Sequence, residues 1–216
     1  LVFRRAYVAP FWQIDATDRR WDWSVARADF RIRTEDRPEA EKFAAYWRRR
    51  LYPGLGDTVR GKGIIYVPLQ ARLLDQRFFQ AASPLAMLET VLTRFPDRPV
   101  AATLHPKLAP AEAEAAALAD LLARFPGLTL DRRAAPEMLA ICDLVVTQNS
   151  AVAFEALFFR KPVLLFAGID FHHPFASVHR DGLDLALAQL QARAPDYDGY
   201  LWWYLQCQSL NAGRED

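Results

Sequence analysis

The sequence has few cysteines, a balanced charge and no long apolar run. Its two cysteines, Cys142 and Cys207, lie far apart in apolar surroundings, which argues against a disulfide framework or a zinc site. Lys and Arg total 27 against 26 for Asp and Glu, so the net charge of +1 gives no long-range field that would gather nucleic acid. No apolar run approaches the roughly 20 residues that a membrane-spanning helix needs. We therefore expect a cytoplasmic protein that does not bind nucleic acid.

Several motifs with well-understood chemistry are also missing. There is no glycine-rich dinucleotide fingerprint, no P-loop and no Gly-x-Ser-x-Gly elbow. Asp196 and Asp198 could in principle hold a divalent metal, but they directly precede a helix and are interpreted as helix caps. His172 and His173 are adjacent, so on a strand or a helix they are expected to point apart and to make a poor metal pair. The sequence therefore predicts neither a metal site nor a cofactor.

The chain of 216 residues is 52% apolar and 25% charged, which suits an ordinary globular protein with one main core. Residues 1–60 are rich in tryptophan and charge without clear periodicity. We expect a lobe edge or a linker there, with a helix over Arg37–Leu51. Residues 61–194 form the predicted main domain, and the aromatic residues 195–216 predict a helix that packs back on the N-terminal segment. The chain begins at Leu1 rather than Met, and two interpretations are open: residues upstream are missing from this sequence, or the protein is a reduced form.

Short apolar runs alternate with longer amphipathic segments in the main domain. The runs lack polar alternation, which is typical of parallel strands covered on both faces. Ser83 with Pro84 marks the start of one intervening helix, and Pro110 marks the start of another. The predicted strands are Ile64–Pro68, Val100–Leu104, Leu128–Leu130, Leu144–Thr147 and Val163–Ala167. This pattern predicts a doubly wound parallel sheet in a Rossmann-like α/β domain.

Polar side chains follow several of these strands. Ligands of an open parallel sheet bind at the carboxyl ends of its strands, and those ends meet at one edge. The side chains that follow them therefore form one candidate ligand site. Its members are Gln70, His105, Lys107, Gln148, Asn149 and Ser150.

Ser150 is expected to cap the helix that follows it. The free backbone N–H groups and the positive dipole end of that helix could accept a phosphate, although a plain N-cap is the alternative. Glu155 lies in the same, otherwise apolar, helix and needs hydrogen-bond donors, which a ribose or sugar diol would supply. A structural salt bridge with Arg160 or Lys161 is the alternative for Glu155.

His105 is the candidate catalytic residue. A histidine at the end of a strand could hold a phosphate oxygen or assist a departing phosphate, and Lys107 would add a fixed positive charge. A lone histidine is more often structural. The shared edge with Gln70 and Ser150 favours a functional role here.

Several stretches together resemble a known family. They are "YVPLQ", Arg77 and Gln80 within "DQRFFQAASPLAMLE", "TLHP" and "VVTQNSAVAFEALFFRKPVLLF". The opening "YVAPFWQIDATDRRWDW" and the closing "LWWYLQCQSLNAG" are similar as well, so the likeness covers nearly the whole chain. The sequence resembles bacterial capsular polysaccharide biosynthesis proteins related to the Kdo transferases of capsule assembly.

The resemblance implies a two-lobed, metal-independent GT-B glycosyltransferase whose C-terminal lobe binds an activated sugar, typically CMP-Kdo. By that likeness His105 and the helix after Ser150 would hold the phosphate, and Glu155 would hold the ribose or cytidine. The implied partners are a nucleotide-sugar donor, a glycan or glycolipid acceptor, and other capsule-assembly proteins at the inner membrane face. A complete GT-B enzyme also has an N-terminal acceptor lobe, which usually supplies the catalytic base.

A glycosyltransferase of this type is the main functional hypothesis. The alternative is a non-catalytic module of the machinery of capsule synthesis or export, which binds a nucleotide sugar or a partner enzyme. A third interpretation is an epimerase related to the nucleotide-sugar epimerases of GT-B shape. Sugar transfer by the chain, or isomerisation of a nucleotide sugar without an acceptor, would distinguish them.

Overall fold

A computed structural model describes residues 1–54, 62–105, 109–192 and 194–213. The chain divides into two compact units. Unit 1 comprises Leu1–Gly54, Ile169–Pro174 and Ala194–Asp216, and unit 2 comprises Leu55–Gly168 and Phe175–Arg193. Unit 1 thus contains both ends of the chain together with a short segment that the sequence analysis had placed in the main domain.

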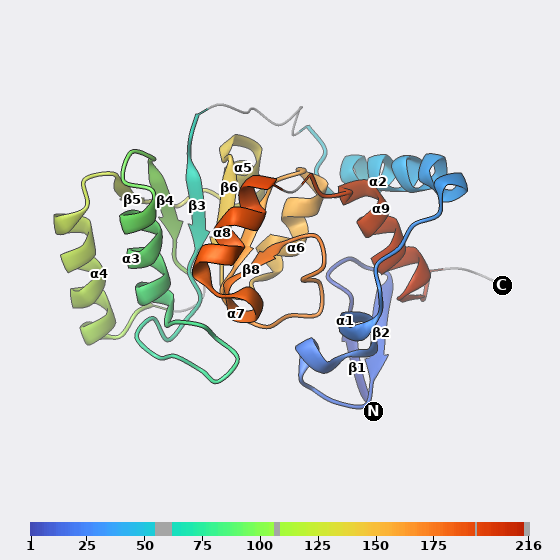
Figure 1. Cartoon of the computed structure of the whole chain (residues 1–216), viewed down its shortest axis with the longest axis horizontal. Helices are drawn as coiled ribbons and strands as arrows, with labels where there is room; N and C mark the ends of the chain where they lie inside the picture. The colour runs from blue at the N-terminus through green and yellow to red at the C-terminus, as the bar shows by residue number, and fades with distance from the viewer. Residues whose placement is uncertain (55–61, 106–108, 193, 214–216) are drawn as a thin grey trace. The chain divides into compact units, whose positions relative to one another are not determined.

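Unit 2 is built on one sheet of six parallel strands (Figure 1). Their order across the sheet is β5-β4-β3-β6-β7-β8. The first strand of the unit, β3, therefore lies in the middle, and the direction of winding reverses between β3 and β6, as in the Rossmann fold. The strands are β3 (Ile65–Pro68), β4 (Val100–Thr103), β5 (Leu128–Leu130), β6 (Leu144–Thr147), β7 (Val163–Leu165) and β8 (Ala176–Ser177). The predicted doubly wound α/β fold is confirmed.

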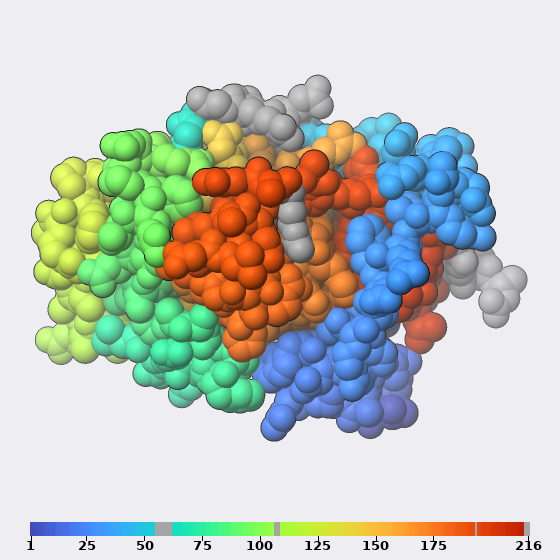
Figure 2. All heavy atoms as spheres, in the orientation of Figure 1, coloured from blue at the N-terminus to red at the C-terminus, as the bar shows by residue number. Residues whose placement is uncertain are grey.

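Helices cover both faces of this sheet. One face is covered by α3 (Pro84–Arg94), α4 (Glu112–Arg124) and α8 (Leu183–Ala192), which follows the short α7 (Val178–Asp181). Figure 2 shows the side chains of α3, α4 and α8 closing over that face. The other face is covered by α5 (Ala135–Ile141) and α6 (Ala151–Phe158), which pack against β3 and β6. Strands covered on both sides must be apolar throughout, which explains why they read as continuous apolar runs.

The helix starts of unit 2 follow local capping chemistry. The Ser83 hydroxyl accepts a hydrogen bond from the backbone N–H of Ala86, as expected of an N-cap. Helix α4 begins at Glu112, two residues after the predicted start at Pro110. Its Glu114 carboxylate accepts from the backbone N–H of Ala111 at 2.9 Å, and this contact sets where the helix begins.

Unit 1 contains strands that the sequence analysis did not predict. They form an antiparallel sheet of β1 (Val2–Arg5), β2 (Phe11–Asp15) and β9 (Leu210–Asn211), in the order β1-β2-β9. The helices of the unit are α1 (Ser24–Arg27), α2 (Arg37–Leu51), α9 (Tyr197–Trp202), the 3-10 turns Arg20–Asp22 and Thr34–Asp36, and the π-helical Trp203–Cys207. Helix α2 has the predicted bounds, and α9 packs against it. Across the described residues of both units, no helix combines the length and the hydropathy that crossing a membrane requires.

Two polar pairs singled out in the sequence lie in unit 1. Asp196 caps α9 by accepting from the backbone N–H of Gly199 at 3.0 Å, and it pairs with Arg37 at 2.9 Å. This geometry agrees with the interpretation of Asp196 as a cap. The expectation that His172 and His173 point apart was wrong, because they lie in a loop and their rings stack with centroids 4.3 Å apart.

Candidate functional site

A cavity of about 1020 Å³ lies at the carboxyl edge of the unit 2 sheet. Its volume is at the upper end of the range of roughly 300–1,000 Å³ that is usual for small-molecule sites. The walls come from the ends of β3, β4 and β5 and from the starts of α5 and α6. The lining residues are 66, 68–70, 103–105, 130–135 and 150–152.

The topology of the sheet explains this position. The chain leaves β3 toward one face and leaves β6 toward the other, so the two connections diverge and leave a crevice between them. The Thr147 hydroxyl donates to the backbone carbonyl of Pro68 at 3.2 Å and ties the ends of the two central strands together. The cavity lies at the place where ligands bind in this fold.

Three of the predicted site residues line the cavity: Gln70, His105 and Ser150. His105 is exposed on the wall. The Ser150 hydroxyl accepts from the backbone N–H of Val152 at 3.3 Å, so the predicted N-cap of α6 is confirmed. The Oε1 atom of Gln70 is buried and has no hydrogen-bond partner among the described residues. An unpaired buried acceptor costs about 1–3 kcal/mol, which makes the Gln70 side chain a candidate to turn toward a ligand hydroxyl.

The other predicted residues do not line the cavity or fall outside the described residues. Gln148 is fully buried, and its side-chain amide donates to the backbone carbonyl of Ala82 at 2.9 Å. Asn149 and Glu155 are half-buried beside the site. Lys107 belongs to residues 106–108, which the structure does not describe.

Two glutamines fix the loop that follows β3 and carries Gln70. Gln148 holds the end of this loop at Ala82. Gln80 is buried, accepts from the backbone N–H of Arg77 at 2.7 Å, and forms a β-bridge with Ala167 after β7. Gln80 and Gln148 therefore stabilise the loop that carries Gln70 to the cavity wall.

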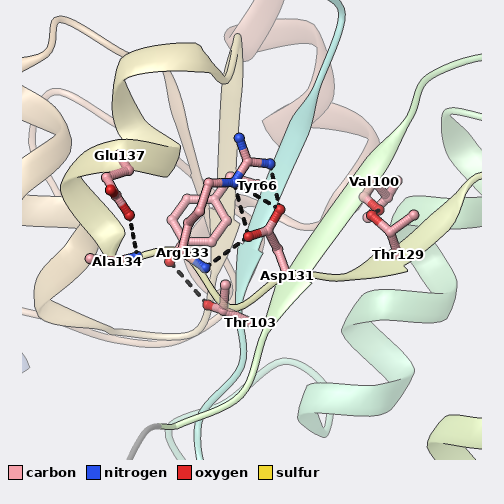
Figure 3. Close-up of polar contacts among 8 residues, drawn as sticks. All are labelled: Tyr66, Val100, Thr103, Thr129, Asp131, Arg133, Ala134 and Glu137. Atoms are coloured by element: carbon pink, nitrogen blue, oxygen red, sulfur yellow. Dashed lines mark hydrogen bonds and ion pairs between the residues drawn. The ribbon is translucent and has the colours of Figure 1, made fainter.

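The sequence analysis missed a charged cluster after β5 (Figure 3). The Asp131 carboxylate accepts from the backbone N–H of Arg133 at 2.8 Å and from its guanidinium at 3.0 Å, in a clamp with several contacts. These bonds from Arg133 lower the pKa of Asp131 to about 2, so the carboxylate is charged at neutral pH. The sequence analysis considered the polar side chains after four of the predicted strands. The fifth strand, β5, is followed by "DRR", which are polar side chains of the same kind.

A part-buried pair of hydroxyls lines the cavity (Figure 3). The hydroxyls of Tyr66 and Thr103 are 3.0 Å apart. Burial raises the pKa of Tyr66 to about 12, although its bond with Thr103 acts in the opposite direction. The nearby charges of Glu155 and Asp131 contribute to the same rise. Tyr66 is therefore neutral at physiological pH and can exchange hydrogen bonds with a ligand, but it cannot act as a base.

A smaller hollow of about 360 Å³ adjoins the cavity on the side of α4. It shares Gln70, Leu104 and His105 with the large cavity, and adds Arg72 and Glu114. Gln70 and His105 thus lie where the two hollows meet. A ligand that extends from one hollow to the other would contact both side chains.

The sequence matches no protein-family profile and no curated protein. Several solved structures are similar to it. The beta Kdo 2,7 transferase of KpsC from Thermosulfurimonas dismutans is 19% identical, with a TM-score of 0.48 over 75% of this chain and 54% of that one. The beta Kdo 2,4 transferase of the same protein is 15% identical, with a TM-score of 0.40 over 65% of this chain and 47% of that one. The H444N variant of the wall teichoic acid polymerase TagF is 14% identical, with a TM-score of 0.43 over 77% of this chain and 43% of that one.

Two of these similar structures are thus Kdo transferases. This chain spans about half the length of those structures or less. Likenesses at these identities and TM-scores do not establish an activity for this chain.

Proposed function

We propose that unit 2 is the donor-binding lobe of a glycosyltransferase that takes a nucleotide-activated sugar of the CMP-Kdo type. The product would be a capsular or related surface polysaccharide. The observation that carries the proposal is the nucleotide-sized cavity at the switch point of a Rossmann-order sheet, with His105 on its wall and the start of α6 beside it. In this topology, nucleotide phosphates bind at that place.

The proposed reaction breaks the bond between the anomeric carbon and the donor phosphate. The nucleotide leaves with the bonding electron pair, and an acceptor hydroxyl forms the new glycosidic bond and loses its proton. Negative charge grows on the leaving phosphate, and N–H donors from His105 and the first turn of α6 would stabilise it. We propose that this transfer needs no metal. We also propose that it takes place in the cytoplasm, at the inner membrane face, together with other capsule-assembly proteins.

The predicted site residues have different parts in this proposal. Gln70 would accept a hydrogen bond from a sugar hydroxyl, and Gln148 would hold the loop that presents Gln70. Direct contacts of Asn149, Glu155 and Lys107 with the nucleotide sugar stay predictions.

A calorimetric titration with CMP tests the role of His105. We expect His105→Ala to weaken binding by at least about tenfold, the usual effect of losing one hydrogen bond to a charged group. His179→Ala is the matched control, because His179 is exposed on α7 and is not among the cavity-lining residues. Wild-type affinity in the His105 variant would refute its assignment to the phosphate.

One observation favours the alternative of a non-catalytic module. On the sheet of unit 1, Phe3 pairs with Ile14 and Trp12 pairs with Leu210, and all four side chains are exposed. Neighbouring exposed apolar side chains are typical of a surface that binds a partner. Formation of a glycosidic product from CMP-Kdo by the chain would exclude a purely non-catalytic role, whereas nucleotide binding without transfer would support it.

A further inference from the structure

Three charged side chains follow β5, and all three line the large cavity: Asp131, Arg132 and Arg133. Asp131 and Arg133 are bound to each other in the clamp, so their charges offset one another. The Arg132 side chain makes no ion pair or hydrogen bond within the residues that the structure describes. Its guanidinium is permanently charged, so it gives this wall one uncompensated positive charge.

The other charged groups around the cavity do not remove this charge. Asp131 is the one carboxylate among the described residues of its lining. The start of α5 is already capped by Glu137, whose carboxylate accepts a hydrogen bond from the backbone N–H of Ala134 at 2.9 Å (Figure 3). The first turn of α6, by contrast, holds no acidic residue. Arg132 and the start of α6 therefore both contribute positive potential to the lining, and Glu155 lies half-buried further along α6.

The backbone of Arg132 is also held in place. The Asp131 carboxylate, before it, accepts a hydrogen bond from the backbone N–H of Arg133, after it, at 2.8 Å. The turn is thus fixed on both sides of Arg132, and less conformational entropy is lost when its side chain binds an anion. The Arg132 side chain is exposed and lines the cavity, so its guanidinium is accessible to a ligand there.

We infer that Arg132 binds the phosphate of the ligand that occupies the large cavity. The inference rests on the proposed function and adds to it a phosphate-binding residue that no sequence motif marked. The Asp131–Arg133 clamp positions Arg132 and does not itself contact the phosphate. The ligand class that follows is a phosphate-bearing molecule such as a nucleoside monophosphate or its sugar ester, and the unphosphorylated nucleoside should bind much more weakly.

The test compares CMP with cytidine by calorimetry on the full chain. We expect Arg132→Ala to weaken CMP binding by about 10- to 100-fold, as for the loss of a charge-assisted hydrogen bond, and to leave cytidine binding unchanged. Arg132→Lys keeps the charge and should restore part of the affinity for CMP. Arg94→Ala is the matched control: it removes the same charge from an exposed side chain in the last turn of α3, at the opposite edge of the sheet.

The outcomes separate this inference from the proposed function. If the wild-type chain binds CMP and Arg132→Ala binds it equally well, the inference is wrong and the proposed function stands. An equal loss of affinity for CMP and for cytidine would also overturn the inference. Arg132 would then maintain the shape of the cavity rather than bind the phosphate. If the wild-type chain binds neither compound, the proposed function fails and the inference fails with it.

Discussion

Asp131 and Asp170 show how the surroundings of one residue type decide its charge. Asp131 is half-buried, and its hydrogen bonds from Arg133 lower its pKa. Asp170, in unit 1, is fully buried, and that burial raises its pKa. Arg20, at 3.3 Å, and the hydroxyls of Tyr7, at 2.6 Å, and Tyr204 act against the shift without reversing it. Donors dominate in the first case and desolvation in the second.

The raised pKa of Asp170 predicts a pH-dependent stability for unit 1. A carboxyl whose folded pKa lies above its ordinary value of 3.8 stabilises the fold at low pH, and this contribution is lost as the pH rises through the folded value. Asp170→Asn removes the titration. The unfolding free energy of the wild type minus that of the variant should therefore fall as the pH rises from about 4, by at most about 1.4 kcal/mol per pH unit.

Urea unfolding followed by tryptophan fluorescence measures this difference, because all six tryptophans belong to unit 1. Using the difference between the two proteins cancels the contribution of other carboxyls such as Asp131. A difference that stays constant over this pH range would show that the burial of Asp170 does not control its ionisation.

At the scale of elements, two helices of unit 2 begin with the same cap but differ in what lies beside them. Ser83 caps α3 through the N–H of Ala86 at 3.2 Å, and Ser150 caps α6 through the N–H of Val152 at 3.3 Å. Replacing either serine by alanine should cost about 1 kcal/mol of stability, measured by urea unfolding followed by circular dichroism. Of the two variants, Ser150→Ala alone should also weaken CMP binding, because α6 begins at the cavity and α3 does not. Equal weakening in the Ser83 variant would mean that stability, not the start of α6, controls binding.

Sequence patterns predicted the strands of unit 2 well and missed the strands of unit 1, for a physical reason. The central strands of unit 2 are buried on both faces and appear as apolar runs. In β2 the usual pattern is reversed: the buried positions include Gln13 and Asp15, and the exposed positions are Trp12 and Ile14. Asp15 is satisfied there by the backbone and hydroxyl of Ser24. Such tertiary partners are invisible in the sequence, and β8 and β9, of two residues each, are too short for any pattern.

At the scale of the molecule, the sequence located the edge of the site better than the role of each residue. Gln70, His105 and Ser150 follow strands whose ends meet, so the parallel topology alone brings them to one cavity. The supporting role of Gln148 could not be predicted from the topology. Its partner Ala82 lies 66 positions away, in a loop whose path depends on the folded sheet. Arg132 could have been found, since it follows β5 as His105 follows β4.

The most direct test of the central claim is a nucleotide screen on the full chain. Thermal shifts and calorimetry with CMP, UDP, TDP and GDP, each with and without magnesium, report whether the cavity binds a nucleotide and which one. We predict that CMP stabilises the chain regardless of magnesium, by about 2.7 kcal/mol at a hundredfold excess over its dissociation constant. Stabilisation by none of the four nucleotides would contradict the claim that this cavity is a nucleotide-sugar site.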